Sequence, residues 1–238
     1  MIGVAADIWE EKASFVSREK FIAALVTTLG KEAQHKRSMG EAADIGTVVH
    51  NAIERKLLGE MGLSVPEVKK FSLNPEQKAS ARQAYEAFLE WKEKHKFRAI
   101  EIEKRLYSVK HRYAGTMDVL GEGNLENEFI YNDLAVGDWK TSVSIYLSAC
   151  LQISAYREAC IELGLHDLSI RKLNGLILRL PKNPDDPGFE ARFIPQERME
   201  TYFVSFLAAK AVWHAVQEYE KEFPWRRKRA KKKEKLAA

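Results

Sequence analysis

The sequence predicts an α/β domain in which β-strands are flanked by helices. Between residues 99 and 108, apolar and polar residues alternate with the period of two that is typical of strands. Residues 171–180 form a mostly apolar run, as expected of a strand buried inside a sheet. On both sides of these segments, apolar residues recur every three or four positions, which favours amphipathic helices. The 238 residues, 45% of them hydrophobic, suffice for one sizeable domain.

The composition excludes several classes of protein. No apolar run approaches the roughly 20 residues of a membrane span, and the first residues lack the basic segment of a secretory signal. We therefore expect a cytoplasmic protein in a reducing compartment, with no membrane partner. Cys150 and Cys160 are too few for a zinc or iron–sulfur cage and too far apart on one predicted helix for a local disulfide. We expect both to be buried packing residues.

The formal net charge of +4 is distributed unevenly, because arginine and lysine gather in residues 226–233. Such a run fits an arm that contacts phosphates. A solvated tail or a nuclear-localisation signal has the same composition. We predict one domain over residues 1–224 with an N-terminal helical part, followed by a basic tail over residues 225–238.

Three helices are expected before the first strand. The first covers residues 17–33, and the second contains residues 46–57. The third begins at Asn74, a suitable N-cap, has Pro75 in its first turn and continues to about Lys94. The apolar stripe of the second helix is formed by Val49, Ala52, Ile53 and Leu57, and that of the third by Ala81, Ala84, Tyr85, Phe88 and Trp91.

Strands are predicted at residues 99–108, 113–120 and 128–140, with a turn-rich segment at residues 121–127 that allows the last two to pair antiparallel. Strict alternation in the first strand places one set of side chains on one face: Ile100, Ile102, Lys104 and Leu106. The opposite face then carries Glu101, Glu103 and Arg105, which also suits an exposed edge strand.

The second half of the chain continues with a helix at residues 145–163, the buried strand at residues 171–180, a loop at residues 181–188 and a short strand at residues 189–194. A long helix is predicted at residues 197–223. Its inward-facing residues are expected to be Phe203, Phe206, Leu207, Val212, Trp213 and Val216.

A group of charged side chains is predicted where two strands meet. If residues 136–140 form a strand, Asp138 and Lys140 project to one side while Trp139 points to the other. Asp118 lies on the preceding strand, so two carboxylates and an amine converge. Carboxylate oxygens hold Mg²⁺ or Mn²⁺, and a nearby lysine can orient water and stabilise negative charge. An Asp-x-Lys pair alone also fits a solvated strand edge.

Three polar side chains on helices are further candidates. His50 lies on a helix edge beside the core, and Gly46 before it allows a close approach to a neighbouring segment. Gln152 and Tyr156 are spaced by four residues and share one helix face, where they suit hydrogen bonds to a phosphate or to the lysine. A structural histidine and a surface Gln–Tyr pair would show the same spacing.

Five separated pieces follow one another along the chain: Gly46-x-x-x-His50, Glu103, Gly115-x-x-Asp118, Asp138-x-Lys140 with Thr141-Ser142, and Gln152-x-x-x-Tyr156. Together they resemble the RecB-type branch of the PD-(D/E)xK nuclease superfamily. That branch includes the RecB nuclease domain, CRISPR-adaptation nucleases, the mitochondrial genome maintenance exonuclease and phage exonucleases. The resemblance covers about residues 46–157, and its specificity comes from the order of the motifs.

The resemblance implies a restriction-endonuclease-like core, in which a central mixed β-sheet is flanked by helices. It implies that His50, Asp118 and Asp138 bind Mg²⁺ or Mn²⁺, with the backbone carbonyl of Trp139 as a further ligand. Lys140 is the implied catalytic lysine. The bound ion would lower the pKa of a water molecule and polarise the phosphate.

The resemblance also assigns roles to the remaining residues. Gln152 and Tyr156 match the motif that follows the lysine and would help place the scissile phosphate or the strand end. Glu103 matches a catalytic acid near the metals on the first strand, although Glu101 competes for that role. The chain lacks the four cysteines that hold an iron–sulfur cluster in several relatives, so none is expected.

These expectations describe a metal-dependent DNA exonuclease that hydrolyses phosphodiester bonds in replication, recombination or repair. Its partner would be DNA, single-stranded or with a free end, held by Lys31, Lys36, Arg37 and the basic tail. A replication or recombination protein could be a second partner. The alternatives are a non-catalytic nucleic-acid-binding accessory subunit of the same fold and a site-specific endonuclease.

Overall fold

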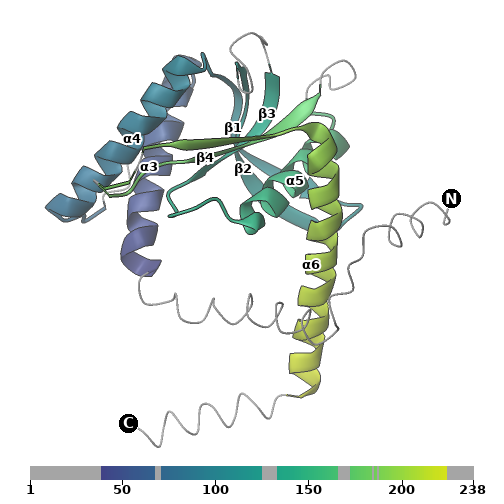
Figure 1. Ribbon diagram of the computed structural model, residues 1–238. Helices are drawn as coiled ribbons and strands as arrows, with labels where there is room; N and C mark the ends of the chain where they lie inside the picture. The colour runs from purple at the N-terminus through teal and green to yellow at the C-terminus, as the bar shows by residue number, and fades with distance from the viewer. Residues whose placement is uncertain are drawn as a thin grey trace, which may run out of the picture. The chain divides into compact units, whose positions relative to one another are not determined.

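A five-stranded mixed β-sheet organises the chain (Figure 1). The computed structural model describes residues 39–67, 71–124, 133–165, 172–183, 185–186 and 188–223. The strands lie side by side in chain order: β1 (Arg98–Ser108), β2 (Tyr113–Gly123), β3 (Asp133–Lys140), β4 (Leu173–Arg179) and β5 (Glu190–Ile194). Only β3 and β4 are parallel among these neighbours. Because a parallel pair needs a crossover connection, helix α5 (Leu147–Glu162) lies between β3 and β4 in the chain.

Helices cover both faces of this sheet. Helices α3 (Met39–Glu60) and α4 (Pro75–Lys94) contribute to one hydrophobic core with Trp139 of β3. Helix α5 and the start of α6 (Gln196–Glu222) contribute to a second core on the other face, where Ile153 and Met199 are fully buried. The sheet thus separates two cores, and β4 is buried along its whole length, as predicted for residues 171–180.

Helix α4 begins and ends where the sequence predicted. The side chain of Asn74 accepts a hydrogen bond from the N–H of Gln77 at 2.8 Å, and the Gln77 side chain accepts one from the N–H of Asn74 at 2.9 Å. This capping box satisfies two N–H groups at the helix start, and Pro75 needs no partner there. The described residues also include Cys150 and Cys160, both free and buried on α5 as expected.

The face prediction for the first strand is wrong for Ile102. Ile100 and Leu106 pack with the α5 core, whereas Ile102 packs with the core formed by α3 and α4. Two irregularities break the period of two: the β1–β2 register shifts between Ala99 and Glu101, and Glu103 has a left-handed φ of 48°. An extra residue in one strand moves the following side chains to the opposite face.

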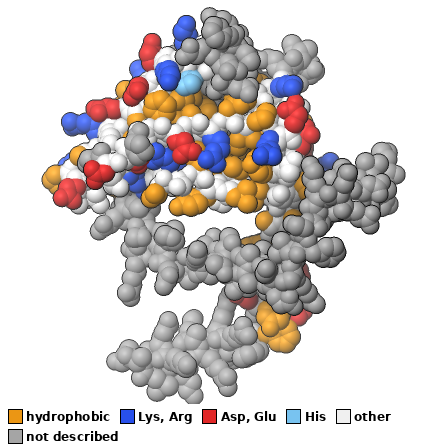
Figure 2. Space-filling model, viewed as in Figure 1, with side chains coloured by type: hydrophobic (Ala, Val, Ile, Leu, Met, Phe, Trp, Pro, Cys, Tyr) orange, Lys and Arg blue, Asp and Glu red, His pale blue; other side chains and the backbone are white. Residues whose placement is uncertain are grey.

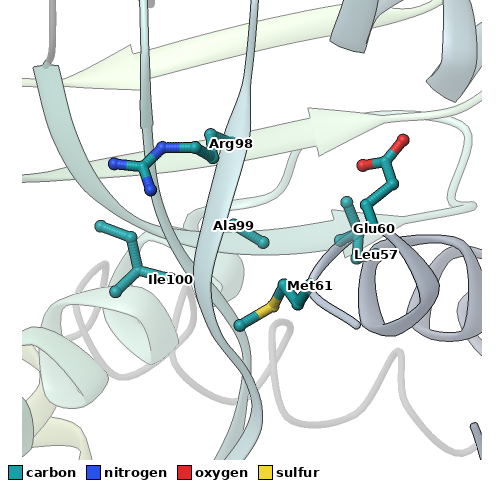
Figure 3. A pocket seen from close by; sticks show the side chains of 6 residues that line it. All are labelled: Leu57, Glu60, Met61, Arg98, Ala99 and Ile100. Carbon is teal, nitrogen blue, oxygen red and sulfur yellow. The ribbon is translucent and has the colours of Figure 1, made fainter. Parts of the chain in front are cut away.

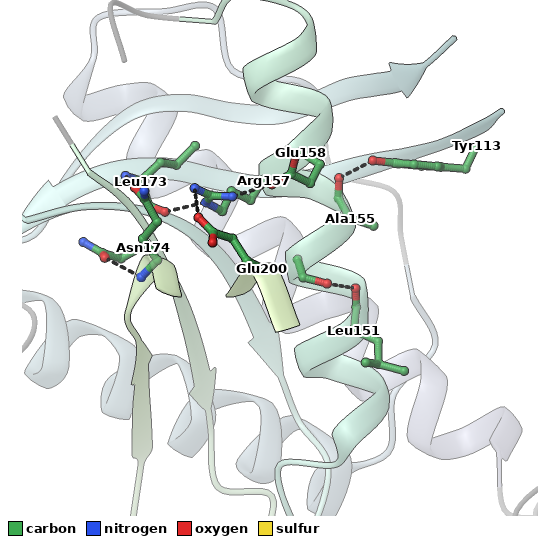
Figure 4. A network of polar contacts seen from close by, with 10 residues as sticks. Tyr113, Leu151, Ala155, Arg157, Glu158, Leu173, Asn174 and Glu200 are labelled. Atoms are coloured by element: carbon green, nitrogen blue, oxygen red, sulfur yellow. Dashed lines mark hydrogen bonds and ion pairs between the residues drawn. The ribbon is translucent and has the colours of Figure 1, made fainter. Parts of the chain in front are cut away.

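A buried arginine ties three elements of the second core together (Figure 4). Arg157 of α5 donates to the carbonyl of Leu173 at 2.8 Å, where β4 begins. It also pairs with Glu158 and lies 3.9 Å from Glu200 of α6. Two residues earlier on the same helix, the Ala155 carbonyl accepts a hydrogen bond from the hydroxyl of Tyr113 of β2 at 2.8 Å. These contacts fix the position of α5 relative to the sheet.

The second half of α6 differs from the prediction. Met199 and Phe203 are the buried residues of this helix, whereas Trp213 is 57% exposed and Val216 is 38% exposed. The helix continues beyond the part of the sheet that it covers (Figure 1), so within the described part of the chain its later residues pack on neither core. The strand predicted at residues 113–120 also extends further, to Gly123.

Several predicted segments lie outside the described residues: the helix at residues 17–33, the basic residues Lys31, Lys36 and Arg37, part of the strand at residues 128–140, and the basic tail. The unit that begins at Ile45 contains the whole sheet and every predicted site residue. Among the helices that the structure describes, none is long and apolar enough to cross a membrane.

Candidate active site

The site forms where β2 and β3 diverge. Their backbone pairing ends at Val119 and Gly137, so the next residues, Asp118 and Asp138, have no ladder partner across this gap. The carboxylate of Asp118 takes the place of the missing backbone acceptor, because its Oδ2 accepts a hydrogen bond from the N–H of Trp139 at 2.8 Å. The two aspartates predicted to converge are therefore held on adjacent strands, and both are buried.

The alternation predicted for β3 is confirmed. The indole of Trp139 packs edge-on against Phe88, Trp91 and Phe97, with ring centroids 5.3, 5.9 and 6.1 Å away. Asp138 and Lys140 lie together on the opposite side, where Nζ of Lys140 is 2.6 Å from Oδ2 of Asp138. Asp138 is only 1% exposed and Lys140 is half-buried, so this is a partly buried ion pair and not the solvated strand edge that the spacing alone allowed.

His50 reaches the site from α3. Its Nε2 lies 3.0 Å from the carbonyl oxygen of Trp139, and its Nδ1 lies 3.6 Å from Oδ2 of Asp118. A carbonyl can only accept, so Nε2 carries the proton and the lone pair of Nδ1 faces Asp118. Gly46 makes this approach possible, since a Cβ there would lie 3.1 Å from Oγ1 of Thr141. The predicted close approach of this helix to a neighbouring segment is thereby explained.

Glu103, and not Glu101, joins the group. One ligating atom from each of His50, Glu103 and Asp118 lies within 4.8 Å of the other two. Glu101 instead pairs with Lys104 at 3.2 Å. The left-handed backbone of Glu103 is uncommon for a residue other than glycine, and such strain often occurs at functional sites.

Helix α5 supplies a chain of hydrogen bonds to the lysine. Lys140 donates to Oε1 of Gln152 at 3.1 Å, and Nε2 of Gln152 donates to the hydroxyl of Tyr156 at 2.8 Å. The Tyr156 ring rests on β2 at Gly115, where a Cβ would lie only 2.6 Å from ring atom Cε1. Gly115, Gln152 and Tyr156 therefore act together to hold the Lys140 amine.

Burial disfavours the charged form of the acids in this site. Burial raises the pKa of Asp118 and of Asp138, and the negative charge of Asp118 raises that of Asp138 further. Glu103 is an exposed residue, but its carboxyl is partly buried. This burial raises its pKa to about 7, together with the charges of Asp118, Glu54 and Asp138. Burial lowers the pKa of His50, so the imidazole is neutral at pH 7. Lys140 offsets part of this negative charge and lowers the pKa of both aspartates, and an added cation would offset the remaining carboxylates.

Glu54 was not assigned a role from the sequence, although its charge acts on Glu103. The available signal was its spacing of four residues from His50 on α3, which places both on one side of the helix. Thr141 was likewise noted only as a neighbour of Lys140. Its side chain is the surface against which Gly46 of α3 packs.

Comparisons with known proteins do not assign this chain to a family. No family model matches the chain. A search of curated proteins finds no match either. The function is therefore argued from the residues that the fold brings together, because a fold class alone does not specify an activity.

A pocket beside β1 lies apart from this group (Figure 3). It is lined by Leu57, Glu60 and Met61 from the end of α3 and by Arg98, Ala99 and Ile100 from β1. Its charges are already paired, because Glu60 lies 2.9 Å from Lys92 and 3.2 Å from Lys56, and Arg98 pairs with Glu122. We assign it no role.

Proposed function

We propose that this protein is a metal-dependent deoxyribonuclease, acting as an exonuclease on DNA. The observation that carries the proposal is the convergence of side chains from five elements on the gap between β2 and β3. These side chains are His50 from α3, Glu103 from β1, Asp118 from β2, Asp138 and Lys140 from β3, and Gln152 and Tyr156 from α5. The same residues carry the resemblance to RecB-type nucleases.

The donor set fits Mg²⁺ or Mn²⁺. Carboxylate oxygens are the ligands that these hard cations prefer, and ligands about 2.1 Å from an ion lie about 3–4 Å from one another. The 4.8 Å span of the His50, Glu103 and Asp118 atoms is close to this requirement. His50, Glu103 and Asp118 would hold the ion, and Asp138 and the Trp139 carbonyl would complete the set of donors. When bound, the ion supplies an activated water and a counter-charge for the phosphate.

Lys140 has two tasks in this proposal. Its ammonium faces the position of the phosphate and balances the negative charge that develops there. It also orients the attacking water. Gln152 fixes the amine from the side opposite Asp138, so the Lys140 side chain keeps one direction in the absence of substrate. Tyr156 positions Gln152 and contributes a hydroxyl near the end of the bound DNA strand.

The fold is compatible with a restriction-endonuclease-like core, because a mixed sheet carries helices on both faces and the candidate residues at the divergence of two strands. Over the described part of the face in Figure 2, basic and acidic side chains are interspersed. Such a surface offers no extended positive field for duplex DNA.

The main rival is a non-catalytic nucleic-acid-binding subunit of the same fold. A remnant site tends to lose a carboxylate or the lysine, whereas Asp118, Asp138 and Lys140 are all present and packed together. A site-specific endonuclease is a third option. Circular DNA separates it from an exonuclease, because an exonuclease leaves a covalently closed circle uncut.

Digestion of end-labelled DNA tests the proposal. Linear single- and double-stranded DNA, labelled at the 5′ or 3′ end, is incubated with the protein and Mg²⁺, Mn²⁺ or EDTA. We expect metal-dependent shortening that is lost in Asp138→Ala and Lys140→Ala and retained in Asp186→Ala, which alters a half-buried acid outside the site. Binding without cleavage in every condition would favour the accessory subunit.

A further inference from the structure

A second pocket lies on the outer side of α3, next to the candidate active site. Thr47, Asn51 and Arg55 are spaced by four residues along α3, so they share one face of the helix. Phe71 closes the pocket from the segment that precedes α4. The cavity has a volume of about 410 Å³, within the range of small-ligand pockets and too small for a duplex.

The walls of this pocket are held in place. Arg55 donates a hydrogen bond to the carbonyl of Pro66, which ties the segment after α3 back to the helix. Phe71 and Asn51 are both half-buried, so each presents part of its side chain to the cavity. The pocket therefore combines an aromatic ring with an amide that can both donate and accept.

The charges of the side chains that line this pocket disfavour a phosphate ligand. Among the described residues that line the pocket, two carboxylates, Glu54 and Glu67, stand against the guanidinium of Arg55, which the Pro66 carbonyl already engages. A phosphate group would be repelled by this lining. A planar, uncharged ring with hydrogen-bonding edges suits it, because such a ring can stack on Phe71 and bond Asn51.

The pocket adjoins the site through Glu54. This residue lies four residues from His50, about 6 Å along the axis, and its charge acts on Glu103. Because α3 carries both His50 of the site and Glu54 of the pocket, a DNA strand whose phosphate lies at Lys140 would pass close to the pocket. A base that is still paired in a duplex cannot enter a side pocket.

We propose that the pocket lined by Thr47, Asn51, Glu54 and Phe71 binds one unpaired nucleobase of the substrate strand. The inference rests on the proposed function and deepens it, because it names single-stranded or frayed DNA as the form that occupies the site. Phe71 supplies the stacking surface, and Asn51 supplies hydrogen bonds to the base edge.

Binding in EDTA tests the inference without cleavage. Fluorescence anisotropy measures the affinity of a labelled ten-nucleotide single strand and of versions in which each position in turn is abasic. We expect one position at which the abasic change weakens wild-type binding roughly tenfold, the size of one base–aromatic stack. Phe71→Leu should weaken binding of the intact strand by a similar factor and lose sensitivity to that abasic position. Asn51→Ala should show the same pattern to a smaller degree.

Trp213→Leu, which alters an exposed aromatic residue on α6, is the matched control and should retain the wild-type pattern. Circular dichroism establishes that each variant is folded. Equal affinity for all abasic strands, or an unchanged abasic effect in Phe71→Leu, would overturn the inference, as would the absence of any binding. Base-dependent binding without cleavage in Mg²⁺ would instead overturn only the proposed function.

Discussion

The two faces of β3 differ in what their side chains contribute. On one face, Trp139 lies in a cluster of aromatic rings, and its indole is buried among partners that match it. On the other face, Asp138 is equally buried but lies beside Asp118, a second acid, and burial raises the pKa of both. The Trp139 face stabilises the fold, whereas the Asp138 face holds carboxylates whose burial costs free energy.

This difference indicates where stability and activity separate. Burying apolar rings contributes favourable free energy, whereas burying like charges costs free energy unless a counter-charge arrives. Substitutions on the Trp139 side should therefore reduce stability, and substitutions on the Asp138 side should reduce activity at little cost in stability. Four predictions test this separation.

The largest effect is expected for Asp138→Asn. We expect cleavage to fall about 10³-fold, equivalent to about 4 kcal/mol, because a metal ligand is lost. Without metal, the free energy of unfolding should stay the same or increase, because burial and the charge of Asp118 raise the pKa of Asp138 even though Lys140 pairs with it. Initial cleavage rates and urea unfolding in EDTA measure the two quantities.

Asp186→Asn is the control for that variant. Asp186 is also a poorly exposed acid, but its partner is the guanidinium of Arg179 at 2.8 Å. Its replacement should cost about 1–3 kcal/mol of stability and leave cleavage unchanged. If the two variants behaved alike, the distinction between the faces would be wrong.

Phe88→Ala tests the aromatic face. Phe88 is fully buried between α4 and the sheet and contacts the Trp139 ring. Its truncation should cost about 3–5 kcal/mol through lost burial and the remaining cavity. Thermal and urea unfolding measure the loss. At a temperature where the variant is still folded, it should retain most of its cleavage activity, in contrast to Asp138→Asn.

Metal and pH should act on the acidic face together. The folded protein holds protons on Glu103 up to about pH 7, while the unfolded chain releases them near pH 4.5. The unfolded state therefore binds fewer protons in this window, and stability without metal should fall as pH rises from about 4.5 to 7. Because ligands must be deprotonated to bind metal, stabilisation by Mn²⁺ should be small at pH 5 and reach about 2.7 kcal/mol above pH 7 at 100 times Kd.

Thermal unfolding across this pH range, with Mn²⁺ or EDTA, checks both trends. Glu103→Gln should flatten the slope measured in EDTA, because the titrating carboxyl is gone. A slope of the opposite sign in the wild-type protein would contradict the assignment of raised pKa values to the acidic face.

The smallest effects concern the support of Lys140. Tyr156→Phe removes the hydroxyl that accepts from Gln152, so cleavage should fall roughly tenfold, with a change in stability of about 1 kcal/mol or less. Gly115→Ala forces the Tyr156 ring to move and should cost about 1–3 kcal/mol in addition to the same loss of rate. Cleavage rates at saturating DNA, together with unfolding curves, distinguish the two variants.

Much of the fold was predictable because its signals are local. The start of α4 depends on Asn74 and Gln77, which are three residues apart, and β4 is apolar along its length because both of its faces are buried. The exposure of Trp213 could not be foreseen, because the helical period continues past the point where α6 leaves the sheet. The faces of β1 were mispredicted at Ile102 because a register shift leaves no mark in the pattern.

The site was predicted in part for a similar reason. Asp138 and Lys140 are two residues apart, so their common side follows from strand geometry. The choice between Glu101 and Glu103 depends on the left-handed backbone at Glu103, which the sequence does not indicate. The contribution of Glu54 to the acidic group depends on how close α3 approaches β1. Both are tertiary effects.

Trp139 joins segments that are far apart in the chain. Its N–H is bonded to Asp118, its carbonyl to His50, and its ring packs against Phe88 of α4. All three partners precede residue 139, so these contacts can form only after β3 has been synthesised. Under the proposed function, a nascent chain that ends before β3 would hold no assembled centre.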